Sequence, residues 1–84
     1  FFMLLTNKTP VTLEILGKEL KPNESQIVTE NRFNKVIVKS ELGICIISTE
    51  LGKHHFTNNG SIVASEEETE NRHGRKSIII SSLQ

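Results

Sequence analysis

Short runs of isoleucine, valine, leucine and threonine recur along the whole chain, and residues that favour turns separate them. Val11 to Ile15 alternates strictly between apolar and polar residues, which is typical of a half-buried β-strand. No stretch keeps the apolar period of an amphipathic helix. The turn signals recur at the spacing expected of β-sandwiches and barrels. We therefore expect an all-β fold, a small antiparallel β-sandwich or barrel of about seven short strands.

Three sets of turn residues indicate where strands should end. The clearest is Lys21-Pro22-Asn23-Glu24-Ser25, because Pro22 presets φ at the second turn position and Asn23 tolerates the left-handed region at the third. Gly17-Lys18 is expected to close a tight hairpin, and Asn58-Asn59-Gly60 is typical of a type I′ hairpin turn. These signals predict antiparallel neighbours joined by short connections.

The length and the cysteine count limit how the chain can be stabilised. Its 84 residues predict one domain, residues 1–84, that buries only about 60–65% of its unfolded surface. Cys45 is the single cysteine, so no disulfide can form within the chain. Because Cys45 lies among isoleucines, we expect it to be a small buried hydrophobe and not a reactive thiol.

The charge balance disfavours several classes of partner. Ten basic and ten acidic residues give a net charge of zero, without the basic excess of many nucleic-acid binders. No apolar run approaches the length of a membrane span. Phe1 to Leu5 is too short for a signal sequence and no basic residue precedes it. We expect a protein that is cytoplasmic or virion-associated, neither secreted nor bound to a membrane.

The segment from Leu20 to Val28 contains Leu-Lys-Pro-Asn-Glu-Ser followed by a hydrophobic strand. It resembles a turn of small bacterial and viral β-sandwiches that reads Leu-x-Pro-Gly-Glu-Ser, with Asn23 in place of the glycine. This resemblance implies an architecture and no activity. Isoleucine, asparagine, lysine and serine are frequent, which is common in the products of AT-rich genomes. Together these features favour a viral or phage-borne protein.

No group of residues indicates catalysis, a metal or a cofactor. The chain has no aspartate, which removes aspartate-based triads and EF-hand loops. The carboxylates of Glu66 to Glu70 are neighbours in a run and are expected to be solvated. On a strand, His54 and His55 point to opposite faces, so they cannot readily bind one ion. We expect one imidazole to be partly buried beside Phe56 and the other to be solvated.

Three apolar runs do not alternate: Val36 to Val38, Ile44 to Ile47 and Ile78 to Ile80. A strand with one wet face should alternate, so a continuous run indicates that both faces are covered. The cover is either a second layer of the fold or another subunit. An exposed strand of this kind would be prone to aggregate. We therefore predict a homo-oligomer whose interface includes Ile37, Ile46 and Ile79.

Residues 66–75 form the only long polar stretch, expected to be a loop. Its second half is basic, and the candidate contact residues for an unidentified protein partner are Asn71, Arg72, His73, Arg75 and Lys76. The sequence thus favours a non-enzymatic structural or protein-interaction module that self-associates and needs no cofactor. One alternative is a small barrel that binds the nucleic-acid backbone through residues 71–76. Another is an enzyme or ligand carrier whose site forms only between subunits.

Overall fold

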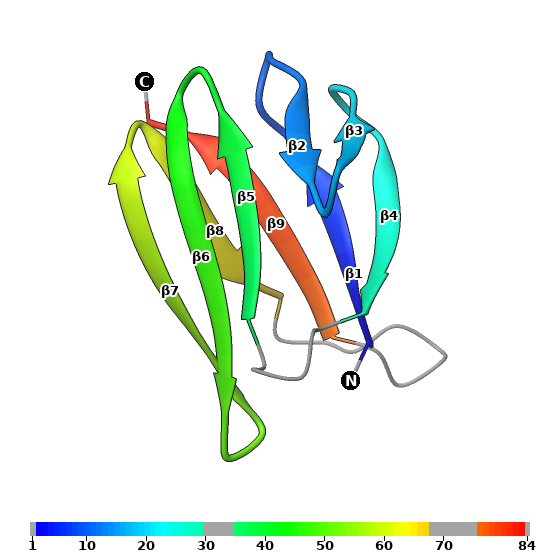
Figure 1. Ribbon diagram of the computed structural model, residues 1–84, viewed down its shortest axis with the longest axis vertical. Coiled ribbons are helices and arrows are strands. Elements are labelled where there is room, and N and C mark those ends of the chain that lie inside the picture. The colour runs from blue at the N-terminus through cyan, green and yellow to red at the C-terminus, as the bar shows by residue number, and fades with distance from the viewer. Residues whose placement is uncertain (1, 30–34, 68–75, 84) are drawn as a thin grey trace.

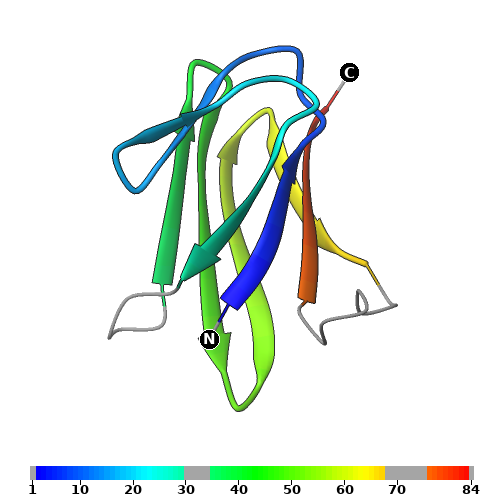
Figure 2. The ribbon, with the colours of Figure 1, turned by 90° about the vertical axis from the view of Figure 1, so that its right-hand side faces the viewer.

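The computed structural model describes residues 2–29, 35–67 and 76–83, which form β-strands and no helix. A four-stranded sheet has the order β4-β1-β9-β8, and a five-stranded sheet has the order β3-β2-β5-β6-β7. The two sheets form the two layers of a sandwich (Figure 1), which Figure 2 shows from the side. The expected all-β fold is therefore confirmed. The strands are β1 (Phe2–Asn7), β2 (Leu13–Ile15), β3 (Lys18–Leu20), β4 (Ser25–Thr29), β5 (Lys35–Ser40), β6 (Gly43–Glu50), β7 (Lys53–Gly60), β8 (Ile62–Glu66) and β9 (Lys76–Ser82).

The first and last strands pair in parallel, which the expectation of purely antiparallel sheets did not include. Leu5 of β1 lies opposite Ile78 of β9, and Asn7 lies opposite Ile80. Every other strand pair is antiparallel. A parallel pair needs a long crossover connection, and here nearly the whole domain lies between β1 and β9. The described residues form nine strands, more than the expected seven, and two of these, β2 and β3, are only three residues long.

The core consists of alternate residues from the facing sides of both sheets. Val36 and Val38 are buried while Ile37 between them is 44% exposed. Ile78 and Ile80 are likewise buried, with Ile79 only partly covered. The expectation that both faces of these strands are covered does not hold within the chain, because the fold has only two layers. The buried hydrophobic residues are Met3, Leu5, Leu13, Ile15, Leu20, Val28, Val36, Val38, Cys45, Ile47, Ile62, Ala64, Ile78 and Ile80.

Two tight hairpins have positive φ at both central residues, as a type I′ turn requires. Leu16 and Gly17 have φ of 52° and 78°, and Ile15 pairs with Lys18. The turn is therefore Leu16-Gly17, one residue before the expected Gly17-Lys18. Leu51 and Gly52 make the second hairpin, with φ of 53° and 77°.

The strand β7 continues through Asn58 and Asn59, so the prediction of a hairpin turn at Asn58-Asn59-Gly60 is wrong. Asn59 pairs with Ile44, and Gly60 pairs with Gly43 at the end of the ladder. From Gly60 the chain crosses to β8 in the other sheet. A Cβ on Gly43 would lie 2.0 Å from the Asn59 carbonyl oxygen, so glycine is needed here because two backbones approach closely.

Asn7, whose side chain is fully buried, connects the end of β1 to two turns, one before β2 and one after β3. Its Nδ2 donates to the carbonyl oxygens of Val11 (2.8 Å) and Leu20 (2.9 Å). Its Oδ1 accepts from the Thr9 backbone N–H (2.9 Å) and the Thr9 hydroxyl (2.6 Å). Its own backbone N–H donates to Glu24, and its carbonyl accepts from Asn23. The turn at Pro22 is thereby fixed to the first strand, and Asn23 has the predicted left-handed conformation, with φ of 68°.

Candidate interaction surfaces

The outer face of the five-stranded sheet presents a cluster of large apolar side chains. Ile37 of β5 lies directly opposite Ile46 of β6. Ile44, two residues before Ile46 on the same face, is 39% exposed. Leu16, in the turn between β2 and β3, is also exposed and lines a pocket together with Ile37. We call these four residues the apolar cluster. Alternation along β5 and β6 places the three isoleucines on the side opposite the core.

Charged side chains of β2, β3 and β5 adjoin the apolar cluster on one side. Lys35 and Lys39 stand on the same face of β5 on either side of Ile37, and both are exposed. Lys39 lies opposite Glu14 of β2, and Glu14 lies opposite Glu19 of β3. The hairpin β2–β3 therefore contributes the acidic groups and β5 the basic groups of this face.

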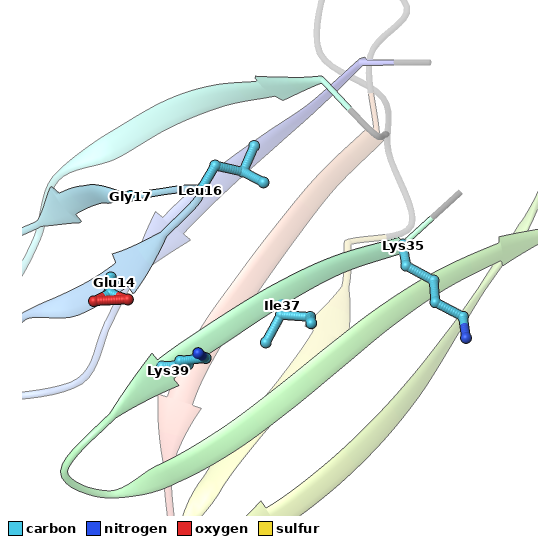
Figure 3. Close-up of a pocket in the computed structure, with 6 residues that line it drawn as sticks. All are labelled: Glu14, Leu16, Gly17, Lys35, Ile37 and Lys39. Carbon is cyan, nitrogen blue, oxygen red and sulfur yellow. The ribbon is translucent and has the colours of Figure 1, made fainter. Parts of the chain in front are cut away.

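Two shallow pockets adjoin the cluster. One has a volume of about 200 Å³ and lies between the β2–β3 turn and β5 (Figure 3). Its lining residues are Glu14, Leu16, Gly17, Lys35, Ile37 and Lys39. A second pocket of about 290 Å³ shares Glu14 and Lys39 with the first. Its other lining residues are Thr12, Leu13, Glu19 and Ser40.

Ile79, the third predicted interface residue, lies on the other side of the molecule. It belongs to the four-stranded sheet, where its register neighbours are Thr6 and Ser65. Ile37 and Ile46 are therefore brought together, but Ile79 cannot share one surface with them. On the outer face of the four-stranded sheet, every outward strand residue whose side chain the structure describes is uncharged. These residues are Leu4, Thr6, Ser25, Ile27, Thr29, Val63, Ser65, Ser77, Ile79 and Ser81.

The histidine pair divides between the two faces of β7 as predicted. The side chain of His54 is only 6% exposed, and its ring stacks on that of Phe56 at a centroid distance of 6.5 Å. The distance between His54 Nδ1 and Glu66 Oε1 is 2.5 Å. His55 is exposed on the outer face. Glu66 belongs to β8, so the expected polar loop begins after this residue. Within the described residues, no three histidine, cysteine or glutamate side chains are grouped closely enough to hold a metal ion.

Cys45 lies in the core, as expected from its isoleucine neighbours. Its side chain is fully buried, and burial raises the pKa of the thiol from 9.0 to about 11. The thiolate is the reactive form, so this thiol is protected from reaction at neutral pH. The described part of the chain also has no helix that could span a membrane.

The predicted partner contact falls mostly outside the described residues. This applies to Asn71, Arg72, His73 and Arg75. Lys76 begins β9 and pairs with Met3. Two exposed apolar residues, Leu16 and Ile27, were not among the predicted interface residues. The signal for Ile27 was its place in the alternation of β4, where Val28 faces the core.

No family model, no curated protein and no solved structure matches this chain. A proposal for its function therefore rests on the surfaces described above.

Proposed function

We propose that the chain is a non-enzymatic protein-interaction module that self-associates, and that the apolar cluster is the surface on which it binds a partner protein. The observation that carries this proposal is the direct pairing of Ile37 with Ile46 in the middle of an exposed sheet face. An exposed apolar patch with a polar rim is typical of protein–protein contact sites. Burial of such side chains on binding would supply the favourable free energy.

The chemistry of the surface indicates what the partner presents. The pocket between Leu16 and Ile37 is smaller than the roughly 300–1,000 Å³ of typical small-molecule sites. It therefore suits one anchoring apolar side chain of a protein better than a cofactor. The partner should carry an acidic group that faces Lys39 and a basic group that faces Glu14, both beside that anchor.

Size-exclusion chromatography with light scattering tests the self-association. The protein should be purified without nuclease, and absorbance should be recorded at the nucleic-acid maximum. Because the chain has neither tryptophan nor tyrosine, bound nucleic acid would dominate the absorbance. We expect a species heavier than the 9.5 kDa chain with little such absorbance. A monomer at every concentration would refute self-association. Strong absorbance that disappears at high salt would favour the alternative, nucleic-acid binding through residues 71–76.

A further inference from the structure

The two sheets end in four edge strands, and three of these are protected. Edge strands present unpaired N–H and C=O groups that can pair with another chain. The edge strand β3 has only three residues, among them Lys18 and Glu19. The edge strands β7 and β8 lie against each other where the sandwich closes, and His54 contacts Glu66 across that boundary. Charge, shortness and mutual cover thus protect these three edges.

The fourth edge, β4, has none of these protections. Its residues Ser25–Thr29 (SQIVT) include neither a charged residue nor a proline. Ile27 at its centre is 50% exposed. Among the described elements, β1 is its only neighbour in the sheet. β4 forms the right-hand edge in Figure 1 and faces the viewer in Figure 2.

The backbone groups of β4 that point outward follow from its register with β1. The Asn7 N–H donates to the Glu24 carbonyl at 2.9 Å, so this pair is hydrogen-bonded. Hydrogen-bonded and non-hydrogen-bonded pairs alternate along antiparallel strands. Gln26 and Val28 therefore direct their backbone groups toward β1. The N–H and C=O groups of Ser25, Ile27 and Thr29 point to the open side of β4.

We infer that a second copy of the chain pairs with this edge, β4 antiparallel to β4, with the two-fold axis at Ile27. This inference rests on the proposed self-association and names its contact. Ile27 would lie opposite the partner subunit's Ile27, and Ser25 opposite the partner subunit's Thr29. All three outward residues would then form hydrogen-bonded pairs, about six backbone bonds in total. The two four-stranded sheets would join into one continuous sheet.

The second copy fits this edge because β4 is complementary to itself. In the antiparallel register about Ile27, the isoleucines pair with each other and the hydroxyl residues Ser25 and Thr29 pair with each other, so no charged residues meet within these five positions. The nearest described acid, Glu24, directs Oε1 back to the Lys21 backbone N–H at 2.8 Å. A five-residue contact lies at the small end of protein interfaces. The dimer should therefore be weak and depend on protein concentration.

Sedimentation velocity over a concentration series tests the pairing. Ile27→Lys places like charges beside the two-fold axis. Ile27→Pro removes an N–H that points away from β1, so it breaks no bond of the sheet itself. Leu51→Lys is the control, because Leu51 is exposed on a turn that belongs neither to β4 nor to the apolar cluster, and Ile37→Lys tests the apolar cluster separately. Far-UV circular dichroism confirms that each variant is folded.

We expect the wild type and Leu51→Lys to dimerise with similar midpoints, and both Ile27 variants to need at least about tenfold more protein. If the wild type dimerises and the Ile27 variants match it, the pairing through β4 is wrong although self-association stands. A loss of the dimer only in Ile37→Lys would transfer the contact to the apolar cluster. A wild type that stays monomeric throughout would refute both self-association and the pairing through β4.

Discussion

Replacing the buried Asn7 by alanine should be among the most damaging single changes in this chain. The substitution removes four side-chain hydrogen bonds that connect the end of β1 to the turns on either side of β2 and β3. The Val11 carbonyl keeps a bond from the Thr9 hydroxyl at 3.0 Å. The Leu20 carbonyl and the Thr9 backbone N–H would lose the partners that Asn7 provides.

The magnitude follows from these two groups. A buried backbone group left without a partner costs about 1–3 kcal/mol, so Asn7→Ala should lower the free energy of unfolding by about 2–6 kcal/mol. Small domains have only about 5–15 kcal/mol in total. The variant should therefore be barely stable, or largely unfolded, at room temperature.

Urea unfolding followed by far-UV circular dichroism measures this loss. Asn59→Ala is the matched control, since Asn59 is an exposed strand asparagine, and its loss should be about 0.5 kcal/mol or less. Asn7→Asp should also destabilise the fold at neutral pH, because a carboxylate cannot donate to the Val11 and Leu20 carbonyls. If Asn7→Ala lowers stability by less than about 1 kcal/mol, then Asn7 does not organise these turns.

Three further outcomes are expected. As the pH rises from about 9 to 11, Cys45 ionises in the unfolded chain but not in the folded chain, so the free energy of unfolding should fall by up to about 2–3 kcal/mol. Cys45→Ala should remove this pH dependence, which urea unfolding measures. Gly43→Ala should lower the midpoint of thermal unfolding far more than Gly52→Ala. A Cβ at Gly43 meets the Asn59 carbonyl oxygen, whereas a Cβ at Gly52 has no atom within 4 Å. Equal losses would contradict this close approach at Gly43. An anionic fluorescent probe of apolar surfaces should bind beside Lys35 and Lys39, and Ile37→Ser, which removes apolar surface without adding a positive charge, should reduce its fluorescence several-fold. Leu51→Ser, on an isolated turn, should not reduce it, and an unchanged signal in both variants would show that the apolar cluster is not an accessible binding surface.

The local sequence pattern was sufficient to predict the elements themselves. Strict alternation from Val11 to Ile15 correctly indicated that Leu13 and Ile15 face the core. The turn at Pro22 and Asn23 followed from residues that preset or tolerate the required φ. The burial of Cys45 followed from its apolar neighbours. These features depend on contacts between residues close in sequence, and for that reason the sequence alone predicts them.

The assignment of each strand to a sheet could not be read from the same pattern. A period of two shows which residues of one strand share a side, but it does not show which strands share a sheet face, as Ile37, Ile46 and Ile79 illustrate. The pairing of Ile37 with Ile46 is local, because β5 and β6 are consecutive strands of one hairpin. The separation of both residues from Ile79 depends on which strands join which sheet, and that involves strands far apart in sequence. The crossing at Gly60 shows the same limit, because a hairpin and a change of sheet both place glycine there.

The sequence by itself thus determined that the chain forms short strands with one apolar side each. Only the tertiary structure decided that β1 and β9 pair in parallel, that the isoleucines divide between two opposite faces, and that β4 is left as the uncharged edge. The physical reason is the range of the interactions. Alternation and turn preference are set within a few residues, whereas a sheet edge exists only after all other strands have found their neighbours.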